Sequence, residues 1–82
     1  MPKLRRLDGK QLVVILERFG FQVVRIRGSH HNMRRVIDGQ SQNLNIPMHG
    51  KKPLSTGTLR GIYRQALEFI PEEELRPHFY TD

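Results

Sequence analysis

The chain has 82 residues, no cysteine and a net charge of +6 at pH 7 with neutral histidines. A chain of this length forms one small domain, and the lack of cysteine excludes disulfide bonds and thiolate zinc sites, which favours the reducing cytoplasm. No apolar run approaches the ~18 residues of a membrane span, and the basic start lacks the apolar segment of a signal peptide. We therefore expect neither a membrane span nor a signal peptide.

The charge is unevenly distributed along the chain. Residues 1–67 contain thirteen Lys and Arg against three acidic residues, whereas residues 68–82 contain one Arg against five acidic residues. A polycationic body of this kind favours a polyanionic partner, and nucleic acid is the first candidate. The alternative is that the charge serves solubility alone.

The first predicted element is an amphipathic helix over residues 9–19. Asp8 is the predicted N-cap, and Gln11 completes a capping box. Gly20 is expected to end the helix in the left-handed conformation. One face carries the apolar residues Leu12, Ile15, Leu16 and Phe19.

Three strands are predicted next, over residues 21–27, 30–37 and 42–48. The first is rich in β-branched residues, and Gly28–Ser29 turns it into the second. Asp38–Gly39 is a strong hairpin signal between the second and third. The segment therefore predicts an antiparallel three-stranded meander.

Two further helices are expected after the strands. Ser55 or Thr56 can cap the second, and Pro71 is expected at the first position of a short third helix that Pro77 ends. The predicted apolar face of the second helix comprises Leu59, Ile62, Tyr63, Ala66 and Leu67.

The predicted fold class is α+β, in the order α-β-β-β-α, with a three-stranded antiparallel sheet covered on one face by the two long helices and followed by a short C-terminal helix. We expect one domain over residues 7–76, a basic N-terminal extension over residues 1–6 and a C-terminal tail over residues 77–82.

Alternation along a strand places the adjacent His30 and His31 on opposite faces of the sheet. His31 shares the parity of Met33 and is expected to be a partly buried structural residue. The other positions expected to face the helices are Val24, Ile26, Ile37, Leu44, Ile46 and Met48. The open face is expected to carry Arg25, Arg27, His30, Asn32, Arg34, Asn43 and Asn45.

An open sheet face with cations, amides and one imidazole suits RNA cleavage. RNA supplies its own nucleophile, the 2′-hydroxyl, so the protein has only to move protons and stabilise the charge on the phosphate. Neighbouring arginines favour a neutral imidazole, hence a base rather than an acid. The alternatives are a plain surface histidine or a metal site, although the histidines at 30, 31, 49 and 78 lack metal-ligand spacing.

Five segments in this order, FGF, RIRGSHHNM, NLNIPMHGKKPL, STGTLRGIYRQAL and PEEEL, resemble the HicA toxin family of bacterial and archaeal toxin–antitoxin systems. The resemblance runs from about Leu7 to Glu74. It implies a fold like that of double-stranded-RNA-binding domains and a ribosome-independent mRNA interferase held inactive by a HicB-type antitoxin. The resemblance also implies a single catalytic histidine, that of the Gly-Ser-His motif, which corresponds to His30 and is supported by Gly28 and Ser29.

The chain departs from the family where Phe21 replaces a frequent tryptophan and Met33 a phenylalanine. Lys51 and Lys52, ahead of the second helix, are placed like the phosphate-binding lysines of double-stranded-RNA-binding domains. His49 in the same loop can assist or be a surface residue. The predicted RNA-binding residues are Arg25, Arg27, Asn32, Arg34, Lys51, Lys52 and Arg60.

The predicted function is that of a cytoplasmic toxin of a type II toxin–antitoxin system, a metal-independent and cofactor-free endoribonuclease with mRNA and a HicB-type antitoxin as partners. The antitoxin is expected to cover the basic face with an acidic surface. One alternative is a non-catalytic RNA-binding module that uses the same face. Another is a relic toxin that keeps the fold but cleaves poorly.

Overall fold

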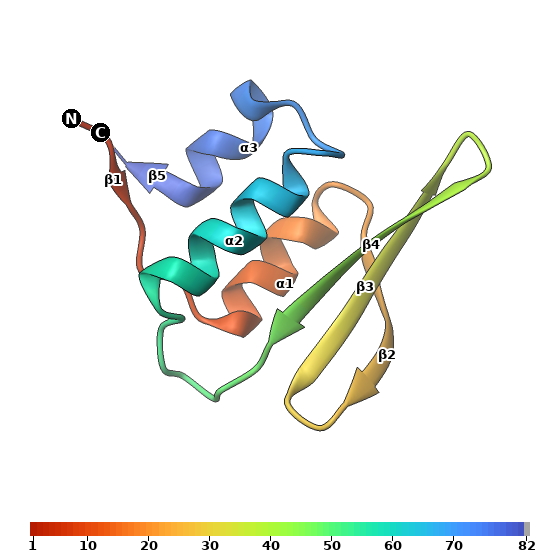
Figure 1. The fold of residues 1–82 in the computed structure, drawn as a ribbon, viewed down its shortest axis with the longest axis horizontal. Helices are drawn as coiled ribbons and strands as arrows, with labels where there is room; N and C mark the ends of the chain where they lie inside the picture. The colour runs from red at the N-terminus through yellow and green to blue at the C-terminus, as the bar shows by residue number, and fades with distance from the viewer. Residues whose placement is uncertain (82) are drawn as a thin grey trace.

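The computed structural model describes residues 1–81 and confirms the predicted order of helices and strands (Figure 1). It adds one short strand near each end of the chain. The elements are β1 (Lys3–Leu4), α1 (Gly9–Glu17), β2 (Gln22–Arg27), β3 (His30–Ile37), β4 (Gln40–Pro47), α2 (Thr56–Ala66), α3 (Glu72–Phe79) and β5 (Tyr80–Thr81).

The main sheet is antiparallel with the strand order β2-β3-β4. Two two-residue turns connect its strands. Asp38 and Gly39 both have positive φ, at 52° and 78°, as the tight β3–β4 hairpin requires. Gly28, in the β2–β3 turn, has a φ of 54°. The turns fix the register, in which His30 lies opposite Pro47 and Met33 opposite Leu44.

Helix α1 begins at Gly9 as its sequence predicts and ends at Glu17, two residues before the predicted end. The Asp8 side chain accepts a hydrogen bond from the Gln11 N–H at 2.8 Å, while the Gln11 side chain accepts one from the Asp8 N–H at 2.9 Å. Gly20 has a φ of 92°, and the Phe21 N–H donates to the Leu16 carbonyl at 3.2 Å. This is the Schellman pattern, which stops the helix and turns the chain into β2.

Helices α1 and α2 cover one face of the sheet and enclose the core with it (Figure 1). The sheet contributes Met33, Leu44 and Ile46, each at most 2% exposed. Burying each such side chain is worth roughly 1.5–3 kcal/mol. The core from the helices and connections comprises Leu7, Leu12, Ile15, Leu16, Phe21, Leu54, Leu59, Ile62, Tyr63, Ala66, Ile70, Leu75 and Phe79.

Three apolar residues expected to face the helices are exposed, so that part of the prediction is wrong. Val24 is 49% exposed because the register shifts between Val23 and Arg25, and the bulge turns Val24 toward the open face. Ile26 is 61% exposed on the edge strand β2, and Ile37 is 45% exposed at the end of β3. Neither packs against the core that the helices and the sheet enclose.

The end of α3 also differs from the prediction. Pro77 does not stop the helix, which continues to Phe79. Leu75 and Phe79 are completely buried, and this packing holds the last turn helical in spite of the proline. Strand β5 then pairs with β1 through Lys3 opposite Thr81, so the two ends of the chain lie side by side (Figure 1).

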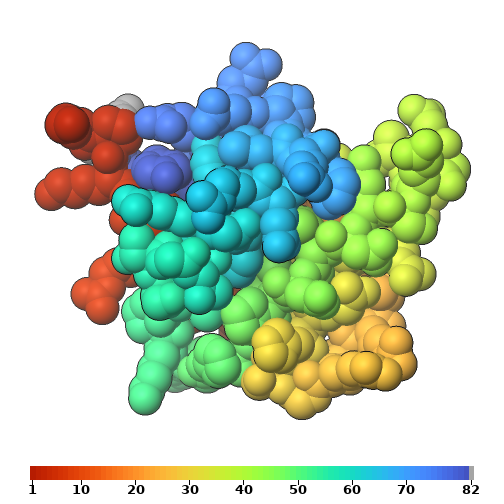
Figure 2. All heavy atoms as spheres, viewed as in Figure 1, coloured from red at the N-terminus to blue at the C-terminus, as the bar shows by residue number. Residues whose placement is uncertain are grey.

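The molecule is flattened, with extents of 38 × 30 × 18 Å. The β3–β4 hairpin projects beyond the helical layer, where the space-filling view shows it as a separate protrusion (Figures 1 and 2). Within residues 1–81, no helix is long and apolar enough to cross a membrane.

Candidate nucleic-acid interface and cleavage site

His30 is the first residue of β3 and follows the Gly28–Ser29 turn. Its neighbours across the sheet are Arg27 on β2 and Pro47 on β4. The side chain is exposed on the open face, as strand alternation predicts. Gly28 shapes the turn that leads into β3. Its φ is positive, a conformation that a larger residue adopts only with strain.

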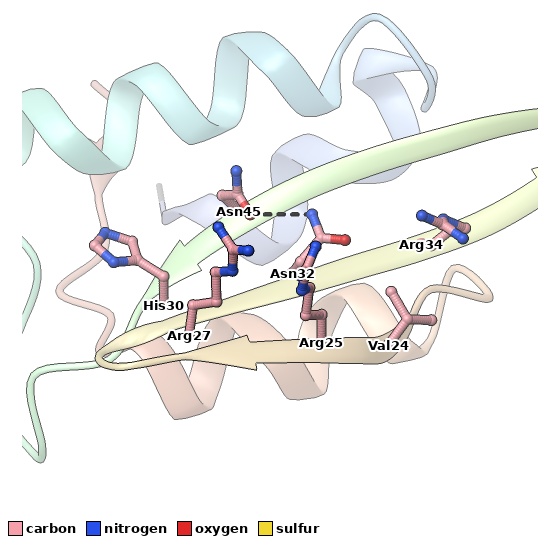
Figure 3. Close-up of a pocket in the computed structure, with 7 residues that line it drawn as sticks. All are labelled: Val24, Arg25, Arg27, His30, Asn32, Arg34 and Asn45. Carbon is pink, nitrogen blue, oxygen red and sulfur yellow. Dashed lines mark hydrogen bonds between the residues drawn. The ribbon is translucent and has the colours of Figure 1, made fainter.

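A groove of about 640 Å³ runs along the open face from His30 (Figure 3). Alternate residues of neighbouring strands meet on this face, so the groove combines three guanidinium groups with amides and one imidazole. Its lining residues are Val24, Arg25, Arg27, His30, Asn32, Arg34 and Asn45.

Hydrogen bonds between side chains hold part of this lining in place. The Asn32 side-chain amide donates to the Asn45 Oδ1 at 3.0 Å across β3 and β4 (Figure 3). The Arg34 Nε donates to the Asn43 Oδ1, also at 3.0 Å. An Arg34 fixed in this way keeps its remaining N–H groups free for an anionic ligand.

His31 points to the opposite face, which confirms the parity argument. It lies opposite the buried Ile46 and is half-buried itself. Among residues 1–81 its buried Nδ1 finds no hydrogen-bond partner. The two adjacent histidines therefore have separate environments and cannot act on one phosphate together.

His30 also lines a second hollow, of about 460 Å³. It lies between the end of β4, the basic loop and the start of α2, and its residues are His30, Pro47, His49, Lys52, Pro53, Leu54, Ser55 and Thr58. His30 is thus shared by two concave surfaces, each of which carries positive charge.

The predicted RNA-binding residues do not all lie on the two concave surfaces. Of the two loop lysines, Lys52 lines the second hollow and Lys51 lines neither concave surface. Arg60 is exposed on α2 outside both. Arg25, Arg27, Asn32 and Arg34 are the predicted contacts that the sheet brings together with His30.

The sequence left His49 either to assist or to be a surface residue, and the structure places it with His30 in the lining of the second hollow. The register of β3 with β4 accounts for this placement. Because Pro47 lies opposite His30, the next pair in the ladder is Met48 with Ser29, which places His49 beside the β2–β3 turn. Within residues 1–81, no cluster of three or more His, Asp or Glu side chains is placed to hold a metal ion.

Comparison with protein families identifies the chain. The family described as "HicA toxin of bacterial toxin-antitoxin" matches residues 9–67. The chain belongs to the HicA toxin family. The match covers α1, the sheet, the basic loop and α2, and so both concave surfaces around His30. Neither the comparison with curated proteins nor that with solved structures gives a match.

Proposed function

We propose that this HicA-family toxin is an endoribonuclease that cleaves mRNA, with His30 as its catalytic base. The observation that carries the proposal is the exposed imidazole at the end of a groove lined by three arginines. A surface that only binds RNA gains little from an imidazole at this position, where lysine or arginine would attract phosphate more strongly.

In the proposed reaction the 2′-hydroxyl of a ribose attacks the adjacent phosphorus. His30 takes the hydroxyl proton as the oxygen attacks, a contribution typically worth ~10²–10⁴-fold in rate. Arg27, its neighbour across the strands, donates hydrogen bonds to the phosphate oxygens, on which negative charge grows. The nucleophile belongs to the RNA, so the reaction calls for neither a metal nor a cofactor.

The remaining polar residues position the strand in this proposal. Arg25 and Arg34 contact phosphates along the groove, and Asn32 hydrogen-bonds to the sugar or base. The RNA then passes His30 and enters the second hollow, where Lys52 meets the next phosphate. Lys51 and Arg60 act farther out, where RNA is attracted before it is bound.

We also infer that a HicB-type antitoxin inhibits the toxin by covering the sheet groove with an acidic surface. Such a surface would neutralise Arg25, Arg27 and Arg34 and exclude RNA at the same time. It would act in the cytoplasm, where mRNA is found. A complex with the antitoxin that leaves His30 open to solvent would contradict this inference.

The competing function is that of an RNA-binding module without catalysis, and one titration separates the two. Purified protein is mixed with labelled RNA over a range of concentrations, and the RNA is recovered on a denaturing gel afterwards. The proposal predicts fragments with wild-type protein and full-length RNA with His30→Ala. Intact RNA at saturating wild-type protein would instead identify a binding module, and binding should then depend mainly on Lys51 and Lys52.

A further inference from the structure

We propose that His49 is a second catalytic residue, which protonates the 5′-oxygen as it leaves the phosphorus. This inference rests on the proposed ribonuclease function and completes it. Phosphoryl transfer puts the attacking and the leaving oxygen on opposite sides of the phosphorus, roughly in line. A single imidazole cannot easily reach both, so a base on one side calls for an acid on the other.

The strand register places His49 beside the turn that precedes His30. The Met48 N–H donates to the Ser29 carbonyl at 2.5 Å, which extends the β3–β4 ladder by one pair beyond His30 and Pro47. His49 is the next residue. It therefore leaves the sheet beside the Gly28–Ser29 turn. The pair just before it joins Met48 to Ser29, and Ser29 is next to His30 in the chain.

Both imidazoles line the second hollow. They are exposed, and imidazole is the side chain that proteins most often use for proton transfer. Lys52 lies in the same lining and can hold a phosphate there. Ser55 and Thr58 form hydrogen bonds with each other. Their hydroxyls lie 2.9 Å apart, and the Ser55 Oγ also accepts a hydrogen bond from the Thr58 N–H.

Contacts with the core, with α1 and within the loop hold the backbone around His49. Met48 packs against the core, and Gly9 at the start of α1 lies so close that a Cβ there would stand 2.6 Å from the Met48 Sδ and overlap the Pro47 carbonyl. The Lys52 N–H also reaches the His49 carbonyl, at 3.4 Å. The backbone on both sides of His49 is thus held in place, which limits the positions that its side chain can take.

The proposed step balances without any co-reactant. The bond from the 2′-oxygen to phosphorus forms while the bond from phosphorus to the 5′-oxygen breaks. The 2′-hydroxyl proton goes to His30, and a proton from His49 goes to the departing 5′-oxygen. The products are a 2′,3′-cyclic phosphate and a 5′-hydroxyl, and exchange with water restores both imidazoles.

A sulfur-substituted substrate tests this role. RNA whose bridging 5′-oxygen is replaced by sulfur has a leaving group that needs no proton, because thiols ionise at a pKa of about 8.5, far below that of an alcohol. We expect His49→Asn to slow cleavage of ordinary RNA by about 10²-fold or more. The same variant should cleave the sulfur-substituted RNA within about threefold of wild type, since general-acid assistance is the only contribution that it lacks.

His30→Asn is the companion variant and should be slow on both substrates, because the attacking 2′-hydroxyl must lose its proton whichever leaving group is present. His78→Asn is the matched control. It changes a histidine on α3 that contacts Phe19 and lines neither concave surface, and it should cleave both substrates at the wild-type rate. Thermal unfolding of each variant verifies that it is folded.

Two results would overturn the role of His49 while leaving the nuclease in place. One is a His49→Asn variant that cleaves ordinary RNA at the wild-type rate while His30→Asn does not. The other is an equal loss on both substrates, which would mean that His49 binds RNA and does not protonate the leaving group. Failure of wild-type protein to cleave either RNA would overturn the proposed function itself, and this inference with it.

Discussion

The guanidinium carbon of Arg35 lies 4.8 Å from the centre of the Phe21 ring. The same guanidinium donates hydrogen bonds to the Phe19 carbonyl at 2.8 Å, the Phe69 carbonyl at 2.6 Å and the Gln42 Oε1 at 2.6 Å. Arg35 therefore ties the sheet to the end of α1 and to the connection after α2. Its neighbour Arg34 points to the open face and lines the groove.

Substitution of these two adjacent arginines should have different effects, one on stability and the other on RNA binding. Arg35→Ala removes charged hydrogen bonds to half-buried carbonyls, so we expect the free energy of unfolding to fall by about 2–3 kcal/mol. Arg34→Ala should change it by less than about 0.5 kcal/mol but lower the salt dependence of RNA binding by roughly one counterion. Urea denaturation and RNA titrations at several salt concentrations measure the two effects. Similar destabilisation by both substitutions would contradict this division.

Gly9 should tolerate no side chain, because Pro47 and Met48 occupy the space that a Cβ would need. Gly9→Ala forces the Pro47 carbonyl and Met48 away from α1, and we expect a loss of about 1–3 kcal/mol from the free energy of unfolding. Gly61→Ala is the matched control within α2. Among residues 1–81 nothing lies within 4 Å of a Cβ at Gly61, so alanine should stabilise the helix by about 0.5–1 kcal/mol. A stable Gly9→Ala variant would show that this contact is loose.

Tyr63 should make the fold sensitive to alkaline pH. Burial of its ring raises the pKa of the Tyr63 hydroxyl above 10.0, and the nearby Glu72, which accepts its hydrogen bond at 3.1 Å, raises it further. The unfolded chain therefore releases this proton at lower pH than the folded chain does. The free energy of unfolding should fall as pH rises from 10.0 through the folded pKa.

Tyr63→Phe removes this titration, so its free energy of unfolding should fall less than that of wild type over the same alkaline range. Urea denaturation at pH 9 and above measures the difference. Parallel pH profiles for the two proteins would mean that Tyr63 ionises alike in the folded and unfolded states.

The parts of the fold that could be predicted depend on local signals. The capping box at Asp8 and the Gly20 stop are encoded within a few residues, and both form as expected. Strand parity likewise placed His30 on the open face and His31 on the covered one, because alternation needs no knowledge of distant contacts.

The failures share a dependence on packing far along the chain. The bulge that exposes Val24 is a property of how β2 pairs with β3, and the helix persists past Pro77 because Phe79 is buried in the core. The pairing of β1 with β5 joins two-residue strands from opposite ends of the chain, too short to show any periodicity. The approach of His49 to His30 likewise required the register of β3 with β4.

The central claim is that the exposed imidazole of His30 performs chemistry on RNA and does more than bind it. The most direct test is the single-turnover cleavage rate of His30→Ala with saturating protein, measured beside its affinity for the same RNA. We predict a rate at least ~10²-fold below that of wild type, with RNA affinity within about twofold because the arginines and lysines remain. A His30→Ala variant that cleaves bound RNA at the wild-type rate would contradict the account.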